Sequence, residues 1–245
     1  MTRLRADLLL VQKGLFATRA RAQEAIAAGL VTANGAVVKK ASETVLQDAV
    51  ITAEAPHPYV SRGGVKLAAA LAHFGIDPAG RVCVDVGSST GGFSDVLLRA
   101  GAAHVTAVDT GRNQFHASLR RHPRIRLLEG TDIRTLDSGD FSPLPDLAVI
   151  DVSFISLSLV VPAVADILAP RAEIIALIKP QFEAGRGNIG KGGIVRDEAV
   201  QAATVSRMLD ELTALGFVPR APIPSPITGG DGNREFLVAA SRDLR

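Results

Sequence analysis

The chain has 245 residues, of which 47% are hydrophobic and 21% are charged, and its formal net charge at pH 7 is +2. This composition predicts a globular protein with a sizeable core, while so small a net charge does not by itself indicate a nucleic-acid partner. The single cysteine, Cys83, excludes an intrachain disulfide, so a reducing, cytoplasmic setting is the default expectation.

Membrane insertion is not expected. An early apolar run at 8–11 follows basic residues, but polar residues break it at once, so a secretory signal is not predicted. The longest apolar region, 144–169, contains Asp146, Asp151, Asp166 and two prolines. A spanning helix needs about 20 mostly apolar residues without such charges.

The beginning of the chain predicts a small α+β domain. Thr18 is a favourable cap for a helix that Gly29 would end, and the Asn34-Gly35 pair is a strong signal for a hairpin turn. The expected elements are helices over 6–15 and 18–28, two short strands within 30–38, and another strand over 48–53. The expected divisions are the small domain at 1–54, a proline-containing linker at 55–61 and a second domain at 62–245.

The small domain resembles the alpha-L RNA-binding module, the S-four-like domain of several RNA-modifying enzymes. The resemblance covers Arg5 to Ala53 and rests on a leucine-rich first helix, a Thr-Arg-x-x-Ala second helix, and the Gly-x-Val and Asn-Gly pairs. It implies that basic side chains bind RNA phosphates without reading the base sequence. The alternative is a solvated helix face and a basic turn. The basic residues concerned are Arg5, Arg19, Arg21, Lys39 and Lys40.

From residue 62 onward, apolar strands alternate with helices, which predicts an α/β domain with a mostly parallel sheet and helices on both faces. A long helix over 195–215 and a closing pair of strands at 217–221 and 235–240 are typical of the Rossmann-like S-adenosylmethionine-dependent methyltransferase fold, so a seven-stranded sheet is expected. The other expected strands are 82–86, 104–109, 125–128, 147–151 and 174–179, with helices over 92–100 and 157–168.

The strand at 82–86 runs into a glycine-rich loop that resembles the S-adenosylmethionine loop of methyltransferases. Glycines let the backbone approach a ligand, and the amides of the following helix can hold a carboxylate. Asp109, at the end of the next strand, suits two ribose hydroxyls, and Asp132 lies where such enzymes often contact the adenine amine. The alternative for Asp85 and the glycines is an ordinary tight turn between strand and helix. For Asp109 the alternative is a helix cap, and for Asp132 it is a turn residue. The predicted cofactor-binding residues are Asp85, Gly87, Ser88, Gly91, Gly92, Phe93, Asp109 and Asp132.

Two other nucleotide sites fit this loop poorly. The Gly-x-x-x-Gly-Gly spacing lacks the close Gly-x-Gly pair of NAD-binding loops, and no Gly-Lys-Ser/Thr follows to form a phosphate loop. The histidines show no metal-ligand spacing, so no metal is expected. The sequence therefore indicates a methyl donor as the cofactor.

Four charged residues resemble the catalytic tetrad of the FtsJ-type rRNA ribose 2′-O-methyltransferases. Asp151 and Lys179 end successive strands, Lys66 lies on the helix that enters the domain, and Glu235 begins the last strand. With the N-terminal module and further segments, the resemblance narrows to the TlyA family of rRNA 2′-O-methyltransferases, historically labelled hemolysins. These further segments are 61–67, 151–157, 179–182 and 190–197.

The resemblance implies a role for each member of the tetrad. Lys179 would lie at the ribose hydroxyl, where it either stabilises charge on the oxygen or, when neutral, accepts its proton; the sequence leaves both open. Asp151 and Glu235 would orient Lys179 and Lys66 and balance their charge. For each charge alone, a surface ion pair is the alternative. Arg62, Lys191 and Arg196 are further candidates for RNA contact, the alternatives being a domain contact for Arg62 and a solvated loop for the other two.

The function implied by the resemblance is methylation of a cytidine ribose in ribosomal RNA, with S-adenosylmethionine as cofactor and ribosomal subunits as partners. The chain ends soon after Glu235, and the resemblance implies that such shorter members of the family modify rRNA of the large subunit only, rather than rRNA of both subunits. At 110–114 it reads Thr-Gly-Arg-Asn-Gln, where relatives commonly carry Val-Gly-Tyr-Gly-Gln. Two other functions are weighed: a non-catalytic ribosome-assembly factor, disfavoured by the complete tetrad, and a membrane-active hemolysin, disfavoured by the lack of a signal or spanning segment.

Overall fold

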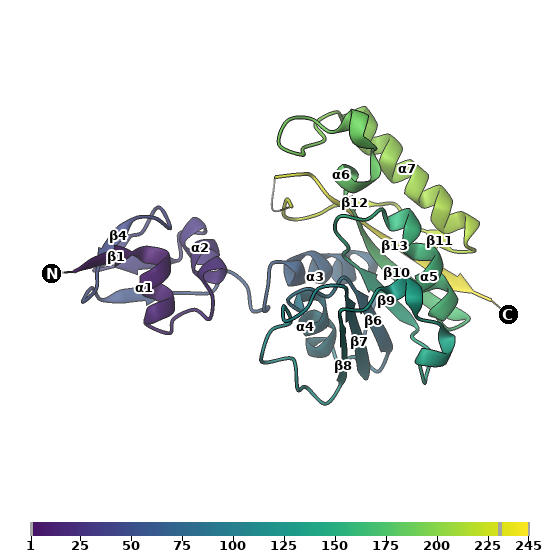
Figure 1. Ribbon diagram of the computed structural model, residues 1–245, viewed down its shortest axis with the longest axis horizontal. Coiled ribbons are helices and arrows are strands. Elements are labelled where there is room, and N and C mark those ends of the chain that lie inside the picture. The colour runs from purple at the N-terminus through teal and green to yellow at the C-terminus, as the bar shows by residue number, and fades with distance from the viewer. Residues whose placement is uncertain (1, 230–231, 245) are drawn as a thin grey trace. The chain divides into compact units, whose positions relative to one another are not determined.

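The computed structural model describes residues 2–229 and 232–244, and Figure 1 shows its ribbon. The chain divides into two compact units, Met1–Pro58 and Tyr59–Arg245. Unit 1 has one apolar core and unit 2 has two, one on each face of its sheet. Each unit is described by itself.

Unit 1 combines two short helices with two small sheets. These elements are β1 (Arg3–Arg5), α1 (Ala6–Gln12), α2 (Arg19–Ala27), β2 (Val31–Ala33), β3 (Ala36–Val37), β4 (Thr44–Leu46) and β5 (Ile51–Ala53). Strand β2 pairs with β3 and β5, and β1 pairs with β4, all antiparallel. Leu9 and Leu10 of α1 pack with Ile26 of α2 and Val31 of β2 in the core.

Three features of unit 1 bear on the sequence predictions. The Asn-Gly hairpin is confirmed, because Asn34 and Gly35 both have positive φ, at 49° and 80°, and β2 pairs with β3 around them. The predicted cap is confirmed too, since the Thr18 side chain accepts a hydrogen bond from the Arg21 amide. The first helix was predicted too long: it ends at Gln12, and Gly14, with φ of 71°, turns the chain.

Unit 2 is a three-layer α/β/α domain. Its helices are α3 (Gly63–Phe74), α4 (Gly92–Arg99), α5 (Val161–Ile167), α6 (Pro180–Glu183) and α7 (Glu198–Ala214). Its short 3₁₀ helices are η1 (Ile133–Thr135), η2 (Ser138–Asp140), η3 (Leu157–Leu159) and η4 (Arg186–Asn188). Its strands are β6 (Val82–Val86), β7 (His104–Asp109), β8 (Ile125–Glu129), β9 (Leu147–Ile150), β10 (Arg171–Ile178), β11 (Val218–Pro219), β12 (Ile223–Pro224) and β13 (Phe236–Asp243).

The strand order of the sheet is β11-β13-β10-β9-β6-β7-β8, with β12 also paired to β13. The five central and edge strands from β10 to β8 are parallel, and β13 runs antiparallel beside β10. The predicted edge strand at 217–221 forms only over Val218–Pro219, as β11, and it pairs with β13 as expected. The sheet has eight strands instead of the predicted seven, because β12 also pairs with β13; both edge strands are short, since their prolines cannot donate to a ladder. The rest of the predicted mostly parallel sheet is confirmed.

Helices cover both faces of this sheet (Figure 1). One core joins α3 and α4 to the sheet through residues such as Leu67 and Leu97, and the other joins α5 and α7 through Val164 and Met208. The predicted helix at 157–168 is split into η3 and α5, with a proline in the first turn of α5. These packed layers hold the ends of the strands in place.

Candidate active site

A cavity of about 350 Å³ opens at the carboxyl ends of β6, β7 and β9. The strand order reverses at β6, which has β7 on one side and β9 on the other. In open α/β sheets, ligands bind in the crevice at such a switch point. Residues from the three strand ends line this cavity, among them Gly87, Ser89, Asp109, Asp132, Asp151 and Phe154.

Gly87 is the predicted glycine that lines the cavity. Its φ is 82°, and a Cβ at this position would lie 2.4 Å from the carbonyl oxygen of Asp151. A side chain would therefore push the loops after β6 and β9 apart.

Gly91 and Gly92 are close-packed against the protein rather than the cavity. A Cβ on Gly91 would lie 2.9 Å from side-chain atoms of Phe115 and Leu119, and one on Gly92 would lie 2.2 Å from Ser61 Oγ. Of the described residues that line the cavity, none is Gly91, Gly92, Ser88 or Phe93. The glycine spacing thus fixes the loop, and Ser89, which the sequence reasoning did not single out, lines the cavity in place of Ser88.

Asp85 is fully buried behind the loop. Its Oδ2 accepts a hydrogen bond of 2.7 Å from Ser94 Oγ in α4, and its Oδ1 has no hydrogen-bond partner among the described residues. Burial raises the pKa of Asp85 to about 7, because the charged carboxylate is removed from water. The carboxyl group therefore ties β6 to α4 and does not line the cavity.

The Asp109 carboxylate organises the rim of the cavity. Its Oδ2 accepts from the Ser89 amide and its Oδ1 from the Gly111 amide, both at 2.7 Å. Glu129, at the end of β8, also holds backbone amides in place, and the sequence did not predict this role. Its carboxylate accepts hydrogen bonds from the Gln114 and Phe115 backbone amides. Both acidic strand ends hold the loop after β7.

Asp132 also lines the cavity, but both of its carboxylate oxygens bind Arg134. Oδ2 accepts from the Arg134 guanidinium at 2.6 Å, and Oδ1 accepts from the Arg134 amide at the start of η1. The hydrogen bond from the Arg134 side chain lowers the pKa of Asp132. The Asp132 side chain thus caps η1 in this structure, whereas the alternative expected for it was a turn residue.

The four tetrad residues form two ion pairs. Lys66 Nζ lies 2.6 Å from Glu235 Oε2, and Lys179 Nζ lies 2.6 Å from Asp151 Oδ1. The sheet brings the pairs together: Ile178 faces Phe236 in the β10–β13 register, so Lys179 and Glu235 follow side by side. Lys66 and Lys179 are each 8% exposed and Glu235 is 3% exposed. Because Asp151 lines the cavity, the second pair borders it directly.

Lys179 has a further partner that the sequence reasoning missed. Its Nζ donates to Ser153 Oγ at 2.8 Å, and it lies 6.0 Å from the centre of the Phe182 ring. An ammonium group has three donors, so two protein contacts leave one N–H for another acceptor. The geometry is suited to holding an oxygen atom at the cavity edge.

Phe154 is the most exposed large apolar side chain of this site, at 93%. Its φ of 65° is a genuine outlier for a bulky residue, and its ring packs at 5.3 Å on Phe182. Strain of this kind collects at functional sites, where the surrounding structure holds it. The two rings are tilted by 54° to each other; Phe182 lies next to Lys179, and Phe154 lines the cavity.

The glycine-rich loop at 190–197 is attached to the segment that precedes Glu235. Asn233, 1% exposed, accepts a hydrogen bond from the Val195 amide and donates one to the Gly193 carbonyl. Lys191 and Arg196 on this loop are exposed, and so is Arg62 at the start of α3. RNA contact by these three residues stays a prediction.

In unit 1, two of the predicted RNA-binding arginines share one buried carboxylate. Asp7 accepts hydrogen bonds from the guanidinium groups of Arg5 and Arg19 and from the side-chain amide of Gln23. The hydrogen bond from Arg5 is the main reason why the pKa of Asp7 lies well below its usual range. Asp7 therefore fixes two exposed basic groups side by side. Arg21 instead donates to the His57 carbonyl, and Lys39 and Lys40 are exposed.

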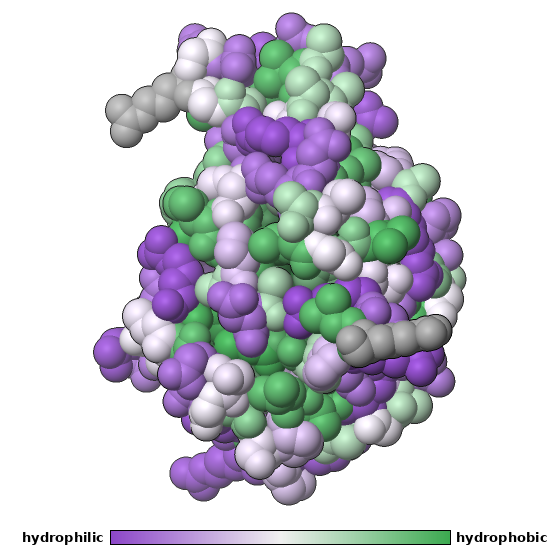
Figure 2. Space-filling view, turned by 90° about the vertical axis from the view of Figure 1, so that its right-hand side faces the viewer, coloured by the Kyte–Doolittle hydropathy of each residue, from purple (hydrophilic) through white to green (hydrophobic). Residues whose placement is uncertain are grey.

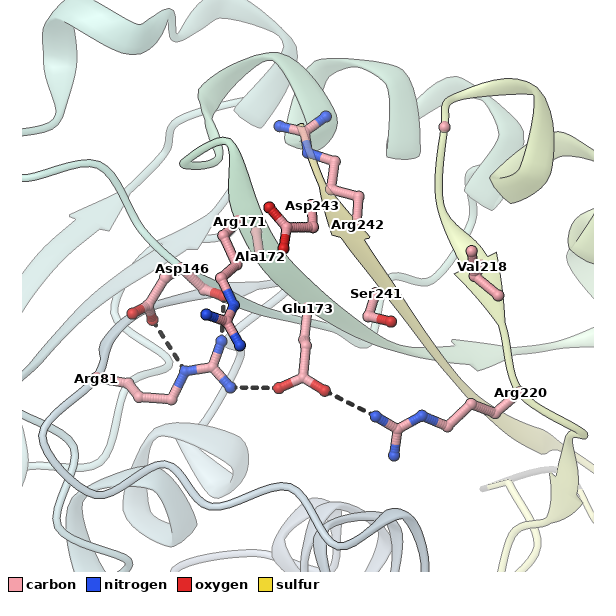
Figure 3. Close-up of a pocket in the computed structure, with 11 residues that line it drawn as sticks. Arg81, Asp146, Arg171, Ala172, Glu173, Val218, Arg220, Ser241, Arg242 and Asp243 are labelled. Carbon is pink, nitrogen blue, oxygen red and sulfur yellow. Dashed lines mark hydrogen bonds and ion pairs between the residues drawn. The ribbon is translucent and has the colours of Figure 1, made fainter. Parts of the chain in front are cut away.

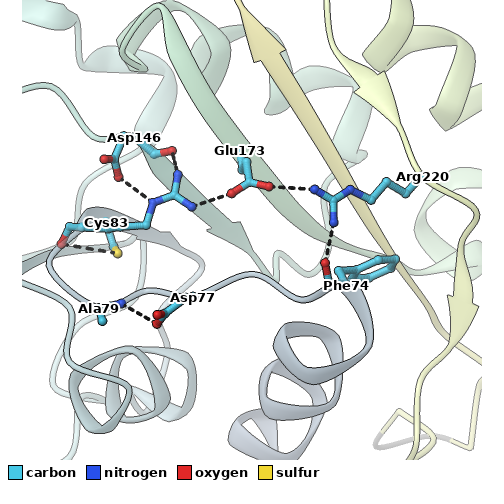
Figure 4. Close-up of polar contacts among 8 residues, drawn as sticks. Phe74, Asp77, Ala79, Cys83, Asp146, Glu173 and Arg220 are labelled. Carbon is cyan, nitrogen blue, oxygen red and sulfur yellow. Dashed lines mark hydrogen bonds and ion pairs between the residues drawn. The ribbon is translucent and has the colours of Figure 1, made fainter.

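A second, larger cavity of about 790 Å³ lies at the opposite end of the sheet. Figure 3 shows Arg81, Asp146, Glu173 and Arg220 joined in a row across it. Arg81 binds Asp146 and Glu173, and Arg220 binds Glu173 at 3.0 Å and the Phe74 carbonyl at 2.5 Å (Figure 4). These charges satisfy one another, so the network joins the sheet to α3.

Within residues 2–229 and 232–244, no helix is long and apolar enough to cross a membrane. No group of three or more histidine, cysteine or acidic residues in them could hold a metal ion. Figure 2 shows hydrophilic and hydrophobic residues intermixed on one face of the molecule.

Comparison with known proteins gives two family matches. The FtsJ-like methyltransferase model matches residues 59–242, and the S4 domain model matches residues 4–51. The chain is 41% identical over 238 residues to the 16S/23S rRNA (cytidine-2′-O)-methyltransferase TlyA of Mycobacterium tuberculosis, covering 96% of this chain and 89% of that protein.

Two further proteins are similar. The 23S rRNA (cytidine-2′-O)-methyltransferase TlyA of Campylobacter jejuni is 42% identical over 183 residues, which cover 73% of this chain and 69% of that protein. A solved structure described as a candidate hemolysin of Streptococcus thermophilus has a TM-score of 0.78 and 41% identity, covering 99% of this chain and 90% of that one.

Proposed function

Because this chain belongs to the FtsJ-like methyltransferase family and carries an S4 domain, we propose that it is an S-adenosylmethionine-dependent methyltransferase acting on a cytidine ribose 2′-hydroxyl in ribosomal RNA. The observation that carries the proposal is the two ion pairs, Lys66–Glu235 and Lys179–Asp151, of which the second borders the switch-point cavity through Asp151. The activities for which two TlyA relatives are named support the choice of RNA and nucleotide.

The cavity fits the proposed cofactor. Each Asp109 oxygen accepts one backbone amide, which leaves lone pairs for ribose hydroxyls, since an ionised carboxylate offers about four acceptor sites. Val108, Ile133 and Ile155 provide apolar walls suited to an adenine ring. When bound, S-adenosylmethionine supplies a methyl group that is already activated on a sulfonium.

Lys179 is the residue that we place at the ribose oxygen. An N–H that its contacts with Asp151 and Ser153 do not use holds the oxygen and stabilises negative charge that develops there. Asp151 and Ser153 fix its direction, and Glu235 does the same for Lys66. The hydroxyl would become strongly acidic as the O–C bond forms and the bond from sulfur to the methyl carbon breaks, so its proton would pass to water without a strong base. Orientation is then the main catalytic contribution.

Phe154 and Phe182 are proposed to stack on the target base. A nucleotide inside a duplex must leave the stack before its ribose can reach a buried lysine, and an exposed aromatic surface compensates for the lost stacking. The strained backbone of Phe154 supports this role, because an exposed apolar ring has no structural reason to be held there. Replacing the ring should weaken the productive binding of RNA and leave cofactor binding unchanged.

The proposed substrate is an assembled large ribosomal subunit. Unit 1 supplies the sequence-independent contact through Arg5, Arg19, Arg21 and the lysines that follow, and its S4 match supports RNA as the partner. One TlyA relative is named for 16S and 23S rRNA and the other for 23S rRNA alone. Methylation of the small subunit is therefore a separate outcome of the test.

The decisive experiment supplies radiolabelled methyl donor to the purified protein with isolated large or small subunits, and maps the modified ribose. We expect label on one cytidine 2′-oxygen of 23S rRNA. Lys179→Ala should reduce transfer by about 10³-fold while cofactor affinity is unchanged. Arg171→Ala, at the far end of the sheet, is the control and should transfer normally. Transfer to a base, or normal transfer by Lys179→Ala, would contradict the proposal.

Membrane lysis is a second activity to test, because the similar Streptococcus thermophilus structure is described as a candidate hemolysin. Vesicles loaded with a dye should release none of it when the purified protein is added at micromolar concentration. Release by the wild type and by Lys179→Ala alike would establish a lytic activity independent of methyl transfer.

A further inference from the structure

The segment between β7 and β8 is unusually basic. Residues 110–128 contain five arginines and two histidines, with no aspartate or glutamate. Strand β8, which ends this segment, is the edge of the sheet (Figure 1). The segment therefore puts a concentration of positive charge on one border of unit 2.

Some of these arginines have structural partners. Arg120 pairs with Glu129 at 2.6 Å, and Arg124 donates to the carbonyls of Leu98 and Ala102 at the end of α4. These two side chains hold the segment against the domain.

Three arginines remain exposed: Arg112, Arg121 and Arg126. Arg126 donates to the backbone carbonyl of Asp140, and among the described residues none of the three has an ion pair with a carboxylate. We call these three side chains the β8 edge surface. Its positive charge is not compensated by partners within the described chain.

The β8 edge surface adjoins the proposed cofactor cavity at Arg112. Arg112 follows Gly111, which lines the cavity, and its guanidinium packs so closely on Gly130 that a Cβ there would lie 2.4 Å from Arg112 Cζ. Between Arg112 and Arg121, Phe115 and Leu119 pack on Gly91 of the glycine loop. The surface is thus fixed to the loop that shapes the active site.

We propose that the β8 edge surface binds backbone phosphates of the substrate RNA that flank the modified nucleotide. The proposal rests on the function proposed above. Exposed guanidinium groups with no carboxylate partner are suited to bidentate phosphate contacts, and such contacts position RNA without reading its sequence. Charges on an edge strand also prevent strands of two molecules from pairing. That role alone would leave RNA affinity unchanged.

The test compares two double variants with the same change in charge. Arg112→Gln/Arg121→Gln removes two groups of the surface, and Arg99→Gln/Arg171→Gln removes two arginines elsewhere on unit 2. Binding to isolated large ribosomal subunits is measured over a range of salt concentrations. We expect the first variant to bind about 10-fold more weakly and to lower the slope of log K against log salt by about 2, since each phosphate contact contributes about 0.7–0.9. Adding Arg126→Gln should lower the slope further.

The control variant should bind as the wild type does, and both variants should bind the methyl donor normally. Equal losses in the two variants, or no loss in the first, would overturn the proposal. Failure of the proposed function is a different result: the wild type would bind the subunits but transfer no label to any 2′-oxygen. A lower salt slope in Arg112→Gln/Arg121→Gln would then still support the β8 edge surface.

Discussion

The two ends of the central sheet both hold ion pairs, but they are built differently. At the carboxyl end, each lysine has one carboxylate partner, at 2.6 Å, and lies near the cavity. At the amino end, Arg81 donates to Asp146 and Glu173, and Glu173 also accepts from Arg220. The second network uses its donors and acceptors on itself, whereas the first leaves ammonium donors for a substrate.

Because of this difference we place the proposed active site at the smaller cavity rather than the larger one. Charged side chains that satisfy one another gain little from a ligand, and the arginine network joins the starts of β6, β9 and β10 to the end of α3. The smaller cavity is lined by glycine backbone and acidic strand ends, and two of its lining residues, Asp151 and Ser153, hold Lys179. Chemistry at the carboxyl end and support at the amino end are therefore separable by mutation.

The largest expected effect is at the catalytic end. Glu235→Gln keeps the shape of the side chain but removes the charge that orients Lys66. We expect methyl transfer to fall by about 10²-fold, the order of effect of a misplaced catalytic group, with cofactor affinity unchanged. Asp243→Asn, at the other end of β13, is the control and should be fully active. A normal rate in Glu235→Gln would remove Glu235 from the catalytic group.

Asp85, near the end of β6, gives a pH test of the same region. Its pKa is raised to about 7 from an ordinary 3.8, so between these values the folded state binds the proton more tightly than the unfolded state. Its contribution to stability is therefore present at low pH and lost as pH rises to 7. From pH 5 to 8 the wild type should lose about 3 kcal/mol of unfolding free energy relative to Asp85→Asn. Parallel urea curves at the two pH values measure this difference.

Arg81, just before β6, should show the reverse of the pattern expected for Glu235→Gln: a loss of stability with little loss of rate. Arg81→Met leaves Asp146 and Glu173 without their main partner, but the two carboxylates are 40% and 22% exposed, so water compensates in part. We expect a loss of about 2 kcal/mol in unfolding free energy, below the 3–5 kcal/mol for fully buried pairs. The rate of methyl transfer at 25 °C should stay within about twofold of the wild type. A large rate loss without a stability loss would contradict the separation of the two ends.

The sequence predicted the parallel strands well because each carries its own signal. The runs at 82–86 and 104–109 are apolar and end in turns, and both strands form with these bounds. The pairing of β1 with β4 was missed, since each strand has three residues and no alternation to detect. Propensity fails where pairing depends on residues some 40 positions away.

The site shows the same limit. Asp151 and Lys179 could be placed at neighbouring strand ends from local pattern alone, but the Lys66–Glu235 pair joins residues 169 positions apart and depends on where β13 inserts. The contact between Asp132 and Arg134 is local, since the two residues are two positions apart, and it was missed all the same. No local signal predicted that Phe154 would be held with positive φ. The Phe154 backbone and the Lys66–Glu235 pair follow from tertiary packing, which overrides single-residue preference.

The smallest expected effect is at the loop beside the catalytic end. The contacts of this loop are hydrogen bonds of a neutral side chain and not ion pairs. The Asn233 side chain accepts from the Val195 amide at 3.1 Å and donates to the Gly193 carbonyl at 3.0 Å. Asn233→Ala should release the loop that carries Lys191, at a cost of about 1 kcal/mol for lost hydrogen bonds. KM for the ribosomal subunit should rise about 5-fold, with kcat and cofactor affinity unchanged. Asn188→Ala, which removes an exposed hydrogen bond to the Ala184 carbonyl, is the matched control.

Asn233→Asp sharpens this prediction, because it keeps the acceptor for the Val195 amide and loses the donor to Gly193. An intermediate KM would show that the two hydrogen bonds add, and that the loop acts on RNA through its position. A fall in kcat instead would mean that Asn233 supports Glu235, two residues further along the chain. In that case the loop would support the Lys66–Glu235 and Lys179–Asp151 ion pairs rather than the binding of RNA.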